Sequence, residues 1–353
     1  MKIKNITRRK YTGKIHNIGT PPRHNYFAND ILVHNCYMNS KPNDTGIMSV
    51  YHLEKIIKSF DPVPYQIAFG GGEPCEHPDF AQILKVTRKL GVVPNFTTAG
   101  HIWKQEIIDA ANEYCGGIAL SYHPFKGIEW FSETYKKWRE AFRGQINVHL
   151  VASTGASKHL RELVTAGLGS LNIVLLAYYP EVGRAKLDAL MDKQEYMVDF
   201  PDAIKDAIAA GMKISFSEGL IPYFLSRSEI GLNTSMAGPQ EGNYSCYIDE
   251  KGRLSTSSFD PPERIEMRNP EKGVIVPDYQ KMWNSLWGSR ESGGESCYYC
   301  KFQNRCSSPS IHHYLICKYA ALNGGNPPLN AKEMEYQRFC EEYDRKEANE
   351  KGN

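Results

Sequence analysis

The chain has 353 residues, of which 41% are hydrophobic, so it is long enough to bury a sizeable core in two or more structural units. Its 42 Lys and Arg residues nearly balance its 40 Asp and Glu residues, and the net charge of +2 gives no reason to expect nucleic acid or a membrane as partner. The basic N-terminus is not followed by an apolar signal-peptide core, and no apolar run approaches the length of a membrane span. Nine cysteines, an odd number and partly clustered, favour reduced thiols and metal ligation over a disulfide framework. We therefore expect a cytoplasmic protein.

The first 35 residues end in a string that has the chemistry of backbone cleavage. Asn35 can cyclise through its side-chain amide and so cut the chain after itself, and Cys36 places a strong nucleophile just beyond that bond. His34 is placed to donate a proton to the Asn35 carbonyl or to the departing amine, and His24 is a second candidate acid or base. A chance His-Asn-Cys string in a loop is the alternative that such a short pattern leaves open.

The whole segment, from an initiator Met through KYTGK and NIGT to HNYFANDILVHN, resembles the C-terminal fragment of a split intein of the DNA polymerase III type. The resemblance implies a short β-rich part of a Hint fold that splices in trans. An N-terminal split-intein and extein polypeptide would be the partner, and residues 1–35 would be released as the partner's extein is joined to Cys36. Asn17 stands where many inteins have an acidic residue, so either splicing is slower or another group substitutes.

After Cys36, short apolar strands alternate with amphipathic helices. We expect strands at 65–69, 92–98, 117–123, 146–153, 171–179 and 213–219, and helices at 49–60, 78–91, 103–115, 130–142, 158–167 and 201–211. This alternation predicts an α/β fold with a parallel sheet, closed or partly closed, whose chemistry lies at the C-terminal ends of the strands.

Two features at those strand ends are candidate binding residues. The first strand runs into Gly71, Gly72, Glu73 and Pro74, where glycines let a ligand approach the backbone, although a plain glycine turn is the alternative. Ser121 lies at the end of the third of these strands, where a Ser that simply ends the strand by hydrogen bonding is again the alternative. No G-x-G-x-x-G opens a helix, so a Rossmann nucleotide site fits less well. By their position in the predicted fold alone, we expect Asn95, His149 and Arg184 also to face the mouth of the barrel, which is formed by the C-terminal ends of the strands.

Residues 36 to 220 resemble the radical SAM superfamily, in which a partial (β/α)6 TIM-like barrel carries a C-x3-C-x2-C loop after its first strand. Cys36 followed by Tyr37 matches the third cysteine, but Leu32 and Asn29 stand at the other two positions. The resemblance implies that the first strand and the first two cysteines belong to the N-terminal extein, and that splicing completes the loop.

What the resemblance implies about cofactors follows from that loop. Three thiolates, of which Cys36 is one, would hold a 4Fe–4S cluster whose open iron binds S-adenosylmethionine (SAM, AdoMet). The Gly71–Gly72–Glu73–Pro74 turn would receive the methionyl amino group of SAM, and Ser121 would contact its ribose.

The C-terminal third contains Cys246 and then Cys297, Cys300 and Cys306 in C-x2-C-x5-C spacing, which is a metal-binding pattern. It resembles the SPASM and twitch extensions of radical SAM enzymes, which implies an auxiliary iron–sulfur cluster held by these four thiolates. Ser257 and Ser310 stand where a SPASM domain has further cysteines, so one cluster is expected rather than two. A structural zinc site is the alternative. The remaining thiols, Cys75, Cys115 and Cys340, are interpreted as structural or surface residues.

These observations divide the chain into a split-intein fragment at 1–35, a radical SAM partial barrel at 36–235, a cluster domain at 236–330 and a charged tail at 331–353. The resemblance implies an enzyme that, once spliced, cleaves SAM reductively to a 5′-deoxyadenosyl radical, which abstracts hydrogen from a peptide or protein. A reductant protein such as flavodoxin or ferredoxin would supply the electron. The alternatives are a small-molecule substrate, or a non-catalytic iron–sulfur or zinc binding module.

Overall fold

The computed structural model describes residues 26–28, 31–33, 48–60, 63–178, 189, 191–192, 194–217, 220, 223–224, 230–232, 245–250, 252 and 254–255. Within this part of the chain, no helix is long and apolar enough to cross a membrane.

A six-stranded parallel sheet, with its strands in chain order, is the centre of the described residues. Its strands are β3 (Gln66–Phe69), β4 (Val93–Thr98), β5 (Gly117–Ser121), β6 (Gln145–Ala152), β7 (Asn172–Ala177) and β8 (Lys213–Phe216). Because all six run the same way, their C-terminal ends meet at one edge. The strands expected from the sequence are all present, and the expected α/β class is confirmed.

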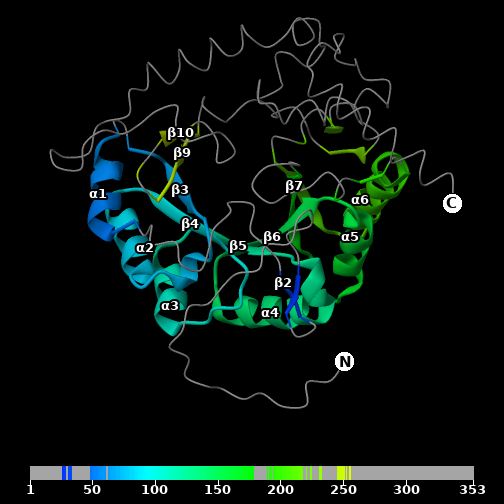
Figure 1. Ribbon diagram of the computed structural model, residues 1–353, viewed down its shortest axis with the longest axis horizontal. Coiled ribbons are helices and arrows are strands. Elements are labelled where there is room, and N and C mark those ends of the chain that lie inside the picture. The colour runs from blue at the N-terminus through cyan, green and yellow to red at the C-terminus, as the bar shows by residue number, and fades with distance from the viewer. Residues whose placement is uncertain are drawn as a thin grey trace, which may run out of the picture.

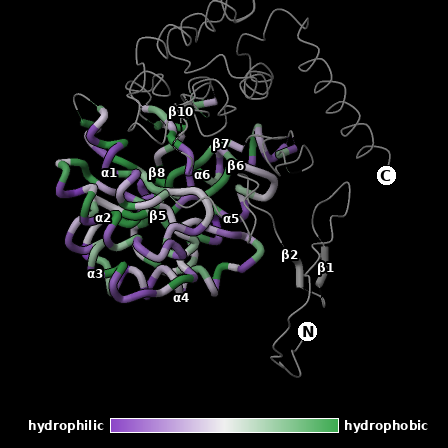
Figure 2. The backbone as a smooth tube through the Cα atoms, turned by 60° about the vertical axis from the view of Figure 1, so that its left-hand side comes forward, coloured by the Kyte–Doolittle hydropathy of each residue, from purple (hydrophilic) through white to green (hydrophobic). Residues whose placement is uncertain are grey.

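Each helix except the first, which precedes β3, connects successive strands of the sheet, and the helices lie on the outer, convex side of the curved sheet (Figure 1). They are α1 (Val50–Lys58), α2 (Phe80–Lys89), α3 (Gln105–Tyr114), α4 (Gly127–Ala141), α5 (Ala156–Thr165) and α6 (Phe200–Ala209). Local signals start and stop them: the Ser49 side chain accepts a hydrogen bond from the His52 N–H at the start of α1, and Gly91 takes a positive φ of 85° after α2. Along these helices hydrophilic and hydrophobic residues alternate (Figure 2), as amphipathic helices on a sheet require.

The helix-facing side of the sheet forms the core, and the opposite side is more open. In β6, Ile146, Val148 and Leu150 are buried, whereas the residues between them are only partly buried. The rings of Phe80 and Phe96 meet edge to face at 5.2 Å between α2 and β4. The alternation therefore assigns every second residue of a strand to the open face.

Two details differ from the sequence-based expectation. Helix α4 begins at Gly127 rather than at residue 130, directly after a short 3-10 turn at Pro124–Lys126. A π-helical turn, Glu195–Asp199, precedes α6 and was not expected. Two small antiparallel hairpins lie outside the sheet: β1 (Tyr26–Ala28) with β2 (Ile31–Val33), and β9 (Tyr247–Ile248) with β10 (Leu254–Ser255). The first falls in the segment expected to be β-rich.

Candidate functional site

The glycine turn after β3 has open space beside its α-carbons. Gly70, Gly71 and Gly72 are exposed, and no atom of the described residues lies within 4 Å of the place where a side chain would begin on any of them. Gly71 has a φ of 115°, a conformation that other residues rarely adopt. The glycines are therefore not required by packing against the described residues, and they leave room for a ligand to approach the main chain at the C-terminal edge of the sheet.

The Glu73 carboxylate, which follows these glycines, is held by the end of the neighbouring strand. Its Oε1 accepts hydrogen bonds from the Thr98 hydroxyl at 2.7 Å and from the Cys75 N–H at 3.2 Å, and its Oε2 accepts one from the Ala99 N–H at 2.8 Å. The side chain is only 8% exposed, and the His101 imidazole lies 3.8 Å from Oε2. The carboxylate therefore ties the turn after β3 to the end of β4. The expected contact of this side chain with the amino group of SAM stays a prediction, and it would have to use the remaining lone pairs.

Cys75 lies beside Glu73 and Thr98, and its thiol is not reactive. It is buried, and its Sγ lies 3.8 Å from the Thr98 hydroxyl. Burial, together with the nearby Glu73 charge, raises the pKa of Cys75 to about 12. Burial likewise raises the pKa of Cys115 to about 12. Both thiols are thus protonated at neutral pH, in agreement with their interpretation as structural residues.

Ser121 and His149 lie side by side on the open face of the sheet. Ser121 ends β5 and is in register with His149 of β6, so both side chains project from the same face near the C-terminal edge. Neither side chain makes a hydrogen bond or ion pair with the described residues, and both are partly buried. Burial lowers the pKa of His149 to about 4, so its imidazole is neutral at pH 7.

Asn95 lies at the wrong height to reach this edge, and the expectation that it faces the mouth is wrong. It is opposite Gly117, the first residue of β5, whereas the mouth is formed where the strands end. Its Oδ1 accepts a hydrogen bond from the Gly117 N–H at 2.8 Å, and its Nδ2 donates to Gln66 at 3.3 Å. Asn95 therefore links three strands near their starts.

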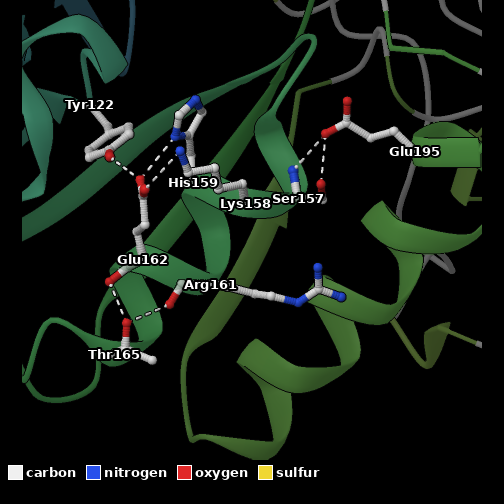
Figure 3. A network of polar contacts seen from close by, with 8 residues as sticks. All are labelled: Tyr122, Ser157, Lys158, His159, Arg161, Glu162, Thr165 and Glu195. Carbon is white, nitrogen blue, oxygen red and sulfur yellow. Dashed lines mark hydrogen bonds and ion pairs between the residues drawn. The ribbon is translucent and has the colours of Figure 1, made fainter.

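Two further carboxylates act on the helix side of the sheet, as Figure 3 shows. Glu195 is 8% exposed and accepts hydrogen bonds from the N–H groups of Gly155 and Ser157 and from the Ser157 hydroxyl, at 2.8, 3.0 and 2.8 Å, so it caps the N-terminus of α5. Sequence reasoning did not single it out, because it lies 38 to 40 residues from its partners.

The other carboxylate, Glu162, accepts a hydrogen bond from the Tyr122 hydroxyl at 2.8 Å and lies 3.0 Å from Nδ1 of His159. Burial, with the Glu162 hydrogen bond as a second cause, raises the pKa of Tyr122. Burial acts to raise the pKa of Glu162, but the hydrogen bonds from His159 and Tyr122 outweigh it and lower that pKa. The Tyr122–Glu162 hydrogen bond joins the residue after β5 to α5, on the helix side of the sheet.

Most of the predicted metal and splicing residues lie outside the described residues, namely His24, His34, Asn35, Cys36, Cys297, Cys300 and Cys306, as does Arg184. Cys246 is described: it is partly buried and comes immediately before β9. The hairpin after it packs on α1, since the His52 ring would stand 3.3 Å from any side chain placed at Gly252. Among the described residues, no three His, Cys, Asp or Glu side chains form a group that could hold a metal ion.

Solved structures of two proteins share the architecture of this chain. SuiB from Streptococcus suis, solved with its precursor peptide SuiA bound, superposes with a TM-score of 0.60 at 14% identity over 86% of this chain and 72% of SuiB. The protein anSMEcpe with bound AdoMet and the Kp18Cys peptide gives a TM-score of 0.52 at 14% identity, over 85% of this chain and 91% of that one. SuiB has also been solved bound to S-adenosylmethionine.

At this identity the likeness establishes the fold, which is the partial (β/α)6 barrel of these AdoMet-binding proteins. Neither the protein-family models nor the sequences of curated proteins give a match to the chain.

Proposed function

We propose that the chain is the main body of a radical SAM enzyme. The observation that carries the proposal is the open glycine turn at Gly70 to Gly72, which lies at the C-terminal edge of a parallel partial barrel of the SuiB and anSMEcpe type. In open parallel sheets, ligands bind at this edge. The AdoMet bound in structures of both neighbours supports SAM as the ligand here.

The residues present fit the methionyl and nucleoside ends of SAM. The turn leaves space in which a main-chain carbonyl can accept a hydrogen bond from an ammonium group, since no side chain of the described residues lies beside these glycines. Glu73 adds a fixed negative charge beside that turn, held by Thr98 and Ala99 rather than free to swing. Pro74 opens the 3-10 turn that begins after Glu73 and is buried, so it fixes the carboxylate's backbone. When bound and reduced, SAM and its cluster supply the radical that abstracts a substrate hydrogen.

Cys36 would be the one ligand that this chain brings to the SAM-binding 4Fe–4S cluster, with two more from the N-terminal partner. A matched pair of samples tests this. The unspliced chain, with Cys246, Cys297, Cys300 and Cys306 replaced by Ala, should bind almost no iron on anaerobic reconstitution. The spliced enzyme should bind a 4Fe–4S cluster and form 5′-deoxyadenosine from SAM with a reductant such as flavodoxin or ferredoxin. A full cluster and SAM cleavage in the unspliced variant would contradict the proposal.

We further propose that residues 1–35 are a split-intein C-terminal fragment, on the strength of the His34–Asn35–Cys36 string and the preceding HNYFANDILV. Co-expression with the N-terminal partner should release residues 1–35 and join the partner's extein to Cys36. Asn35→Ala should block the release, and Cys36→Ala should block the ligation. Intact-mass spectrometry distinguishes these products, and an unchanged precursor in the presence of the correct partner would refute the splicing.

We propose an auxiliary iron–sulfur cluster at Cys246, Cys297, Cys300 and Cys306, in a SPASM- or twitch-like unit. Protein purified without oxygen should be brown and contain iron and acid-labile sulfide, and Cys300→Ala should lose both. One equivalent of zinc in colourless protein would make the unit a structural zinc module. The peptides bound to SuiB and anSMEcpe favour a peptide or protein substrate, and a small molecule is the second candidate. The proposed location is the cytoplasm, on the grounds of composition and cysteine usage given above.

A further inference from the structure

Strand β3 lies at an edge of the sheet, and its helix-facing side is poorly covered. Within the part of the chain that the structure describes, β4 is the one strand that pairs with it. Tyr65, directly before β3, is 83% exposed, whereas Val92, directly before β4, is fully buried. Ile67 is likewise only partly buried, whereas Pro94, its partner in register, is buried. The apolar surface beside β3 therefore lacks the covering that the neighbouring strand receives.

The backbone of β3 also offers hydrogen bonds at this edge. The Val93 N–H donates to the Tyr65 carbonyl at 3.0 Å, so the backbone groups of Tyr65 and of every second residue after it face β4. The N–H and C=O groups of Gln66 and Ala68 consequently face the free edge. A strand that is added at this edge can bond to them, as peptides do when they extend an exposed sheet edge.

The connections of the barrel indicate which strand fits there. Helices α2 to α6 each follow one strand and lead to the next strand along the sheet, always in the direction from β3 to β8. Parallel strands are joined by right-handed crossovers in nearly all proteins. Helix α1 lies on the same side of the sheet as the other helices and leads into β3 (Figure 1). A strand that precedes α1 and runs parallel to β3 therefore has its place at the free edge.

We propose that this edge is the surface on which the N-terminal extein docks before splicing. In the chain, α1 follows Cys36, so the strand ahead of α1 would come from the extein that is joined at Cys36. The inference rests on the proposed splicing and adds a second recognition surface, outside the intein, through which the two polypeptides select each other. The docked strand pairs in parallel with β3 and covers Tyr65 and Ile67 with apolar side chains.

The test measures how fast the two polypeptides separate when they cannot splice. The full chain with Asn35→Ala and Cys36→Ala is immobilised. It is paired with an N-terminal intein half that lacks its own nucleophile and is fused either to its native extein or to an unrelated protein. In biolayer interferometry the native-extein complex should dissociate roughly tenfold more slowly, which corresponds to one or two additional neutral hydrogen bonds.

Two substitutions test whether the effect arises at β3. Ala68→Pro removes an N–H that faces the free edge and none that faces β4, as proline in an edge strand allows. Tyr65→Ser removes the exposed ring. Each should make the native-extein complex dissociate at least about threefold faster, because strand pairing or apolar contact is lost, and leave the unrelated-extein complex unchanged. The matched control is Val198→Ser, an exposed apolar residue in the turn before α6, which should change neither rate.

Equal dissociation rates for the native and the unrelated extein on the chain without these substitutions would overturn the inference and leave the proposed splicing intact. A Tyr65→Ser protein that is folded by circular dichroism and keeps the slow rate would overturn it as well, even where Ala68→Pro fails to fold. If the wild-type chain and the active N-terminal partner neither bind nor splice, the proposed intein itself fails.

Discussion

Replacement of Glu73 tests whether its carboxylate stabilises the fold or serves only to bind a ligand. If the carboxylate served only to bind a ligand, Glu73→Gln would leave the free protein as stable as before. The structure instead has both carboxylate oxygens occupied: Thr98 and Cys75 donate to Oε1, and Ala99 donates to Oε2. Glu73→Gln should therefore unfold the protein more easily in the absence of any ligand.

The size of the effect follows from these contacts. Hydrogen bonds to a charged group contribute about 1.5–3 kcal/mol each, and neutral ones about 1 kcal/mol. Gln keeps an oxygen for Thr98 and Cys75, but it brings its NH₂ group against the Ala99 N–H, which leaves that buried donor unsatisfied. We expect a loss of about 2–3 kcal/mol, or a fall of roughly 5–10 °C in Tm for a domain of this size.

Urea and thermal denaturation of the full chain measure this loss. The matched control is Glu76→Gln, an exposed carboxylate in the same short turn, which should change stability by no more than about 0.5 kcal/mol. Thr98→Val combined with Glu73→Ala, each of which removes the Thr98–Glu73 hydrogen bond, should show a coupling of at least about 1 kcal/mol. Equal stabilities of the Glu73→Gln and Glu76→Gln proteins would refute the assignment of Glu73 as the tie between β3 and β4.

Three further predictions follow from the described contacts. Glu195→Ala removes three hydrogen bonds from the start of α5 and should cost about 2–3 kcal/mol in a urea titration, whereas replacement of the exposed Glu113 should cost almost nothing. Cys75 and Cys115, with pKa values near 12, should resist iodoacetamide at pH 8, where about one thiol in 10⁴ is ionised, and mass mapping should find both alkylated only after unfolding. Because the pKa of His149 is lowered to about 4, the unfolded chain binds up to one more proton than the folded chain between about pH 6.5 and pH 4. The free energy of unfolding should therefore be highest above about pH 7 and fall by about 1–3 kcal/mol as the pH is lowered through this range. His149→Phe should flatten this part of the pH profile of stability.

The fold was predictable because the signals that determine it are local. Period-two and period-3.6 patterns, with glycines at element ends, gave the six strands and the six helices between residues 50 and 216, and the parallel order follows from their alternation. The position of a side chain along its strand, relative to the C-terminal edge of the sheet, was harder to predict. Asn95 and His149 both face away from the helices, but register with the neighbouring strands decides that only His149 lies near the C-terminal edge.

The structural carboxylates were not predictable for a related reason. Glu73 meets Thr98 over 25 residues, and Glu195 meets Ser157 over 38. No periodicity links such positions, because the contact depends on how two connecting segments cross after their strands end. A glutamate after two glycines therefore indicated a ligand, while the structure also gives it a tertiary partner.

These assignments bear on how SAM would be recognised. Two buried carboxylates, Glu73 after β3 and Glu195 at the start of the π-helical turn, both accept hydrogen bonds from backbone N–H groups. A carboxylate whose lone pairs are largely occupied by fixed donors has fewer positions left for a hydrogen bond from an ammonium group. The methionyl ammonium would then depend more on main-chain carbonyls of the glycine turn than on the Glu73 carboxylate.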